Sequence, residues 1–240
     1  MADFPDPGMS LEDMVKHIYL KVNSFDKLFS EQQEKISKLE KDVKTLKTKL
    51  HVLKNTVNAR EQEDRSLNLR ISGVAFTAEE KANPSSINKL VYDRVLLPII
   101  NLAKTNKILE RAPTLANTIT SAYRVRASSA LTGTASPPPV IVRIATDQLR
   151  LAILQSKRRG TPPPLPSEVD LGIRSISVQE DLTPPTYKML REIKRREEVH
   201  SAWTIAGRIR FRLTGSDRIH HVRSVFDSVE DIISAAHIKS

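Results

Sequence analysis

The chain has 240 residues, a formal net charge of +10 and no cysteine. The absence of cysteine excludes disulfides, cysteine-ligated zinc and thiol nucleophiles. No run approaches the roughly 18 apolar residues of a membrane-spanning helix, and the acidic, proline-containing segment 1–10 does not look like a secretion signal. We therefore expect no membrane association and a disordered tail at residues 1–10.

The positive charge lies mostly after the first quarter of the chain. Residues 1–60 carry 11 basic and nine acidic side chains, a net of +2, so residues 61–240 carry the remaining +8. A basic excess is typical of proteins that bind a polyanion such as nucleic acid, although ordinary solubilising charge is an alternative explanation.

Apolar residues recur at alternating steps of four and three from Leu11 to Val57. A repeat that averages 3.5 residues is the seam of a left-handed coiled coil, and a helix of this length is roughly 70 Å long. Such a helix cannot bury its own stripe, so we predict a coiled coil over residues 11–62 that associates with other copies. The seam residues expected at the oligomer interface are Ile18, Val22, Phe25, Phe29, Ile36, Leu39, Val43, Leu46, Leu50, Leu53 and Val57.

The seam leaves the number of copies open. β-Branched residues at the a positions with leucine at d, as in residues 36–46, favour a dimer, whereas the phenylalanines and Ile18 favour a wider core such as a trimer. Gln32 is the only polar seam residue and is either a register pin or simply tolerated. The polar segment 61–66 is expected to be the frayed end of the rod and a short hinge.

The pattern then changes to a period of two, which indicates strands. Residues 63–180 are expected to form one domain in which strands and helices follow the order β-α-β-β-α-β. This order is typical of ferredoxin-like and RNA-recognition folds. The predicted strands are Leu67–Ser72, Thr118–Arg126, Val140–Ala145 and Ile173–Val178, and the predicted helices are 84–97 and 147–160.

The helix boundaries in this domain are predicted from their end signals. Pro98 should end or kink the first helix. Thr146 or Asp147 should cap the second helix, and Gly160 should end it in a left-handed conformation. Residues 127–139 should be a loop.

A second domain is predicted over residues 181–240, where Thr183 precedes Pro184 at the first position of a basic helix. The elements expected there are the helix to about Val199, a strand over Ile205–Leu213 and a last helix over residues 219–233. The predicted fold class is therefore α+β, with a long N-terminal coiled-coil helix, a ferredoxin-like domain of the RNA-recognition type and a small α/β C-terminal domain.

The sequence shows no catalytic pattern. It has no glycine-rich phosphate loop, no Gly-X-Ser-X-Gly turn and no histidines at metal-ligand spacing. His220 and His221 are expected on the surface of a helix. We therefore predict that the protein is not an enzyme and uses no cofactor or metal.

The basic residues are better organised. Arg208, Arg210 and Arg212 alternate along one predicted strand, so they should lie on one face at intervals of roughly 7 Å. Phosphates along a nucleic-acid strand have a comparable spacing, and arginine forms bidentate bonds with phosphate. Arg70 and Arg143 should point outward from adjacent strands of the other sheet. These residues predict a nucleic-acid interface.

Aromatic residues are missing from the two predicted central strands, where RNA-recognition domains commonly stack bases. Tyr123 lies on the second strand, and its alternation places it with the core residues. We therefore expect binding that depends on phosphate contacts, is sensitive to salt and reads sequence weakly.

The chain resembles the first open-reading-frame protein of LINE-1-type retrotransposons in several short sequence motifs, which occur in the same order and at similar spacing. The motifs follow a long coiled coil, and the resemblance as a whole spans about residues 11–235. The motifs are Asn68-Leu-Arg-Ile-Ser-Gly-Val74, Ala122-Tyr-Arg124, Pro139-Val-Ile-Val-Arg143, Ile153-Leu154 with Arg158-Arg-Gly160, Asp181-Leu-Thr-Pro-Pro-Thr186 and Arg210-Phe-Arg-Leu213. The chain departs from mammalian members in its long 127–139 loop, its 162–166 connector and its short N-terminal tail.

The resemblance implies a homotrimer joined by the coiled coil that binds single-stranded RNA, and also DNA, as a nucleic-acid chaperone. It implies that the protein is found in cytoplasmic ribonucleoprotein particles and also in the nucleus, and that it has a role in transposition. It places contacts at Arg70, Arg124, Arg143, Arg158, Arg159, Arg191 and Arg210, to which the charge pattern adds Lys188, Arg195, Arg208 and Arg212. Two alternatives are a coiled-coil scaffold that binds protein and a DNA-binding regulator.

Overall fold

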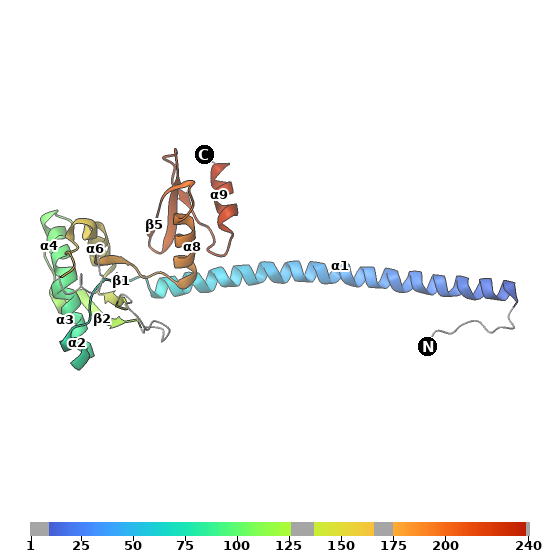
Figure 1. Ribbon diagram of the computed structural model, residues 1–240, viewed down its shortest axis with the longest axis horizontal. Helices are drawn as coiled ribbons and strands as arrows, with labels where there is room; N and C mark the ends of the chain where they lie inside the picture. Colours follow the sequence, from blue (N-terminus) through green and yellow to red (C-terminus); the bar gives the residue numbers. More distant parts are fainter. Residues whose placement is uncertain (1–9, 126–136, 166–174, 239–240) are drawn as a thin grey trace. The chain divides into compact units, whose positions relative to one another are not determined.

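The structure is a computed structural model that describes residues 10–125, 137–165 and 175–238 (Figure 1). Residues 1–9 of the predicted tail, Arg126 of the predicted second strand, residues 127–136 of the predicted loop and the first two residues of the predicted fourth strand lie outside these ranges. Contacts divide the chain into residues 1–54 and residues 55–240, which we describe separately. The α+β class is confirmed, because a long N-terminal helix precedes two antiparallel sheets.

Helix α1 (Leu11–Asp64) contains 54 residues, which confirms the predicted long helix. The Ser10 hydroxyl caps it by accepting a hydrogen bond from the Asp13 amide at 3.2 Å. None of its residues is buried, and the seam side chains are exposed by between 47% at Val57 and 82% at Leu11. The helix therefore has a long exposed apolar stripe that only Gln32 interrupts, and its association with other copies stays a prediction.

Helix α1 continues to Asp64, so residues 61–64 are helical rather than frayed, whereas the turn at residues 65–67 stands where a short hinge was predicted. Gln62 and Asn58 lie one turn apart and both bond to the segment that begins the C-terminal region. The Gln62 amide donates to the Asp181 carbonyl and accepts from the Thr183 amide, both at 3.0 Å, while Asn58 accepts from the Thr183 hydroxyl at 2.6 Å. Thr183 is fully buried at this junction.

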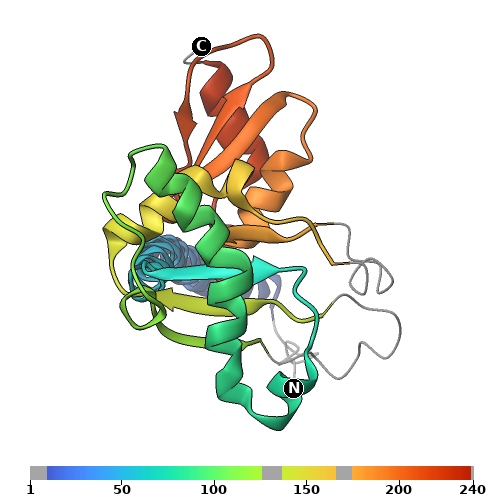
Figure 2. The ribbon, with the colours of Figure 1, turned by 90° about the vertical axis from the view of Figure 1, so that its left-hand side faces the viewer.

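The first sheet within residues 55–240 has four antiparallel strands in the order β2-β3-β1-β4. Leu69, Ile71, Val142 and Ile144 point to one face and are fully buried. The helical segments pack against this face, and Figure 2 shows the α3–α4 segment lying across the sheet. The elements are β1 (Asn68–Ser72), α2 (Ala78–Ala82), η1 (Pro84–Ser86), α3 (Ile87–Val91), η2 (Tyr92–Leu96), α4 (Leu97–Thr105), α5 (Leu115–Thr118), β2 (Ile119–Arg124), β3 (Val140–Ile144), α6 (Asp147–Gly160) and β4 (Ser177–Glu180).

Pro98 does not end its helix, so one of the two predicted effects, an end rather than a kink, was wrong. The helix continues through it to Thr105, and the preceding stretch Tyr92–Leu96 is π-helical, with the Leu97 amide bonded to the Tyr92 carbonyl five residues back. A proline removes one amide donor and crowds the carbonyl four residues before it, and a π-helical stretch at this position accommodates both effects.

Helix α6 begins as predicted, because the Thr146 side chain accepts from the Leu149 amide. The prediction of a left-handed Gly160 was wrong, since its φ angle is not positive. The residue instead allows α6 and α4 to approach closely: a Cβ atom at position 160 would lie 2.8 Å from the Ile99 Cα.

The second sheet has the order β5-β6-β7 and packs its buried face against two helices. Helix α8 begins as predicted at the Thr183 cap but ends at Lys194, and the predicted single strand is a hairpin. Ala206 and Gly207 form its turn with φ angles of 51° and 72°. The elements are α8 (Pro184–Lys194), β5 (Val199–Ile205), β6 (Arg208–Leu213), β7 (His220–His221) and α9 (Val229–His237).

His220 corrects the expectation that both histidines lie on a helix surface. It belongs to β7, is 8% exposed and stacks on Phe211 with ring centroids 5.4 Å apart. The last helix begins only at Val229, where Ser228 caps it, so residues 219–228 are not helical.

The Glu180 carboxylate, at the end of the first sheet, accepts hydrogen bonds from α6 and from the β5–β6 turn of the second sheet. One carboxylate oxygen accepts from the Arg150 guanidinium of α6 at 3.0 Å and from the Ala206 amide at 2.8 Å. The other oxygen accepts from the Gly207 amide at 3.2 Å. The next residue, Asp181, accepts from Arg65 and Asn68, so two neighbouring carboxylates join the end of α1, both sheets and α6.

The Gly160→Ala substitution tests the contact between α4 and α6. Alanine normally stabilises a helix relative to glycine, but here its methyl group meets backbone, so we expect the free energy of unfolding to fall by about 1–3 kcal/mol. Urea denaturation followed by circular dichroism measures the change. Gln155→Ala, at an exposed position of α6, is the control and should change stability by less than about 0.5 kcal/mol. Stabilisation by Gly160→Ala would contradict the contact.

Candidate nucleic-acid interface

The clearest basic surface is the outer face of the second sheet. Along β6, the buried residues Ile209, Phe211 and Leu213 alternate with arginines that point to the opposite face, as predicted. We call Arg208, Arg210 and Arg212 the arginine row. Among the described residues, no carboxylate pairs with any member of this row, so its charge is not compensated locally.

Two aromatic residues lie beside the arginine row. Trp203 and His221 are the register partners of Arg210 on the adjacent strands, so they share its face. The Arg212 guanidinium lies 5.7 Å from the centre of the Trp203 ring. The Nε atoms of Arg210 and Arg212 are buried without a hydrogen-bond partner in the described part of the chain. The face therefore combines cationic guanidinium groups with a flat ring, which suits phosphate and base together.

Sequence reasoning did not find Trp203, because it read this residue as a link before a single strand. The turn at Ala206 and Gly207 brings β5 back beside β6 and thereby adds Trp203 to the face. An Asn-Gly or Asp-Gly pair would have predicted such a turn, but Ala-Gly does not.

A second basic group occupies the ends of α6 and α8. Arg158, Arg159, Arg191 and Arg195 are exposed, and Lys188 is exposed near Glu192 at 3.9 Å. Burial lowers the pKa of the nearby Lys157 ammonium; Glu180 opposes this effect and Lys194 adds to it. A bound phosphate would offset the repulsion between these two lysines.

The face of the first sheet that points away from the helices carries Arg70 and Arg143. Arg70 is partly buried, and Arg143 is exposed and donates to the Asp64 carbonyl at 3.3 Å. The strand register places Asn68 opposite Arg143, and Gln179 opposite Arg70. Both arginines therefore face outward from adjacent strands, as predicted. We call this surface the open face.

Arg124, in contrast, points toward the helices and is 8% exposed. Its Nε and one Nη atom donate to the Glu80 carboxylate at 2.6 and 2.9 Å. The remaining donors bond to the carbonyls of Val74, Ala75 and Pro138 at 2.8–2.9 Å. All five N–H groups are thus used within the protein, which leaves none for a phosphate, and we remove Arg124 from the candidate interface.

Tyr123 also differs from its predicted place. Ile119 pairs with Ile144 but Ser121 pairs with Arg143, so Thr120 is an extra residue in the ladder. This bulge reverses the alternation that follows it. Tyr123 consequently lies on the open face, 56% exposed, rather than with the core.

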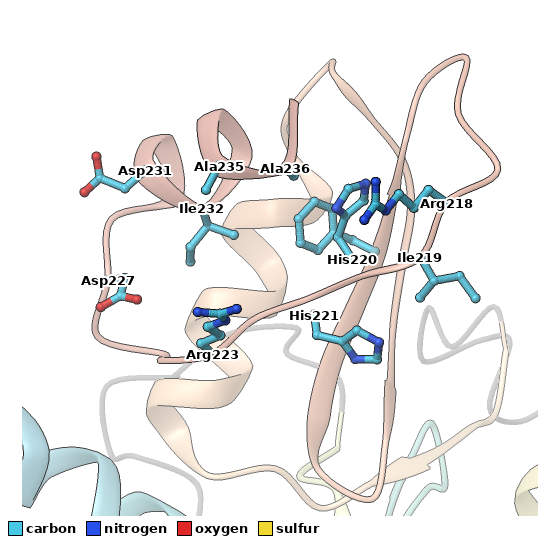
Figure 3. Close-up of a pocket in the computed structure, with 11 residues that line it drawn as sticks. Arg218, Ile219, His220, His221, Arg223, Asp227, Asp231, Ile232, Ala235 and Ala236 are labelled. Carbon is cyan, nitrogen blue, oxygen red and sulfur yellow. The ribbon is translucent and has the colours of Figure 1, made fainter. Parts of the chain in front are cut away.

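A groove of about 440 Å³ lies in the C-terminal region between β7 and α9. Figure 3 shows Ile232 of α9 and His220 of β7 on its two sides. Its charged lining residues are of both signs, including Arg218, Arg223 and Asp227. The groove therefore does not extend the uniformly basic character of the arginine row.

The comparisons with known proteins add no family to this geometry: no protein-family model matches the chain, and no curated protein matches it. Within the described ranges, no three histidine or carboxylate side chains gather closely enough to hold a metal ion. Over the same ranges, no helix has the length and apolarity to cross a membrane.

The Arg124→Ala substitution separates a structural role from a binding role. Because it leaves the Glu80 carboxylate buried without its partner, we expect a loss of about 3–5 kcal/mol in the free energy of unfolding. The exposed Arg143→Ala variant should lose less than about 0.5 kcal/mol in the same urea titration. Equal stabilities of the two variants would show that the Arg124 network is not structural.

Proposed function

We propose that the protein binds single-stranded nucleic acid, chiefly RNA, and acts as a nucleic-acid chaperone within an oligomer joined by α1. The observation that carries this proposal is the arginine row, because three uncompensated guanidinium groups share one face with Trp203 and His221. Alternate residues of a strand are about 7 Å apart, which suits successive phosphates of an extended strand.

The first sheet supports the same function. Its strand order and the helices on one face are compatible with an RNA-recognition type of domain, which we propose for residues 63–180, followed by a C-terminal domain over 181–240. Arg70 and Arg143 supply two further outward charges. Exposed contacts of this kind are individually weak and exchange readily, as a chaperone that rearranges strands requires.

The oligomer is proposed from the exposed stripe of α1. A stripe of this length has no means of burial within the helix itself, and a homotrimer or homodimer would cover it. Several linked sites would then bind one strand at high effective concentration, so that weak contacts give strong overall binding.

We propose that the protein derives from a LINE-1-type retrotransposon. It would package the RNA of that element into ribonucleoprotein particles in the cytoplasm, and part of the protein would be in the nucleus. Two observations support this source. One is the order of the short sequence motifs, and the other is the order of the elements that carry them: a long helix, a four-stranded sheet with helices on one face, and a small three-stranded sheet with two helices.

The Arg210→Ala substitution tests the arginine row. We expect a loss of about 1–3 kcal/mol in binding to single-stranded RNA and a shallower dependence on salt, because one phosphate contact per site is removed. Filter binding over a series of salt concentrations measures both. Arg111→Ala removes the same charge at an exposed position on another segment and should have little effect. Equal losses in the two variants would show that only net charge matters.

The same titration distinguishes the alternatives. A strong preference for duplex DNA over single strands would favour a DNA-binding regulator. No binding to RNA at low salt would favour a scaffold that binds protein.

Two seam substitutions test the role of α1. The double variant Leu39→Asp, Leu46→Asp places charges in the proposed core, so the mass in solution should fall toward the 27.0 kDa of one chain. Light scattering measures the mass. The control variant Ser37→Asp, Thr48→Asp adds the same charges at positions outside the seam and should keep the wild-type mass. A wild-type mass of one chain would refute the proposed oligomer.

A further inference from the structure

Tyr123 occupies a position on the open face that suggests a binding role of its own. It is 56% exposed on β2, which is one of the two edge strands of the four-stranded sheet. Of the other three tyrosines, Tyr92 donates its hydroxyl to the Pro113 carbonyl at 2.7 Å and Tyr187 lies beside Arg191. For Tyr123 the described residues provide no hydrogen-bond partner and no cation–π partner.

The strand register places Tyr123 in one row across the sheet. Tyr123 pairs with Ile141, Ile141 pairs with Arg70, and Arg70 pairs with Gln179. Directly paired residues share a face, so all four side chains belong to the open face. The row thus contains an aromatic ring, an aliphatic side chain, a cation and an amide, in that order.

The neighbouring row supplies a second cation at a suitable distance. Ser121, Arg143 and Asn68 are paired in the same manner. Adjacent strands are about 4.8 Å apart and successive rows on one face about 7 Å apart, so the backbone of Arg143 lies about 8 Å and that of Arg70 about 10 Å from the backbone of Tyr123. Both distances are between one and two nucleotide steps. Ile141 is only 3% exposed, so its side chain is covered, and the Tyr123 ring is the exposed apolar group of this row.

We infer that Tyr123 is a stacking platform for one unpaired nucleobase, with Arg143 and Arg70, which both lie toward the middle of the sheet, positioned for phosphates of the strand as it continues across the open face. This inference rests on the proposed function and makes it more specific: the ligand contributes an exposed base as well as its phosphates. A base in a duplex is stacked between its neighbours and cannot occupy this position, so the site selects single strands. Every base has a flat ring, so the site tolerates all four.

The inference alters the binding mode expected from the sequence. With Tyr123 in the core, the four-stranded sheet could offer only phosphate contacts. With Tyr123 on the open face, part of the affinity should persist at high salt, because stacking does not release counterions as phosphate contacts do.

The experiment compares two oligonucleotides of equal length and charge, one with normal bases and one with abasic sites throughout. The wild type, Tyr123→Ala and Tyr123→Phe are titrated with each by fluorescence anisotropy at high salt. We expect wild type and Tyr123→Phe to bind the strand with bases about 5- to 100-fold more tightly than the abasic strand, and Tyr123→Ala to lose most of that preference. On the abasic strand all three proteins should bind equally.

Two controls complete the test. Ser121→Ala changes an exposed neighbour on the same strand and should keep the preference for bases. All variants should unfold at the wild-type temperature, since the altered side chains are exposed. An unchanged preference in Tyr123→Ala, or a loss in Tyr123→Phe equal to that in Tyr123→Ala, would overturn the inference. If Arg210→Ala still weakened binding in the first case, the proposed function would stand without it; no binding of either strand by the wild type would overturn both.

Discussion

Two adjacent carboxylates hold residues 55–240 together. Glu180 and Asp181 follow one another at the end of β4, and each is less than 10% exposed. Removing a carboxylate from water is costly unless it is fully hydrogen-bonded, and here the donors come from the end of α1, from β1, from α6 and from the β5–β6 turn. The arginine row depends on this junction, since β6 begins immediately after that turn.

The elements that were predictable from the sequence are those with local signals. The 3.5-residue repeat predicted α1, and the caps at Thr146 and Thr183 predicted the starts of α6 and α8. Alternation predicted which side of β6 would carry the arginines. In each case the deciding interaction lies within a few residues along the chain, so the pattern is visible in one sequence.

The features that were not predictable arise from contacts that are distant in sequence. A single extra residue at Thr120 exchanges the directions of Tyr123 and Arg124, so the expected core residue faces outward and the expected surface arginine enters an ion pair with Glu80. No residue type marks this bulge. Gly160 and His220 likewise owe their roles to Ile99 and Phe211, which belong to other elements.

Arginines on strands therefore have two different roles in this protein. On β6 the guanidinium groups have no carboxylate partner among the described residues and remain available to a ligand. On β2 the same group is satisfied by one carboxylate and three carbonyls, and it contributes to stability instead. Burial and the direction of the strand, rather than residue type, determine which role applies.

The junction at Gln62 has a consequence for the order of events during synthesis. Gln62 bonds to Thr183, 121 residues later in the chain. At about 5–20 residues per second, a ribosome needs roughly 6–24 s to cover that interval. The whole of α1 therefore leaves the ribosome well before its last turns can be fixed to the rest of the protein. In the proposed oligomer, nascent helices have this time to find one another before either sheet is complete.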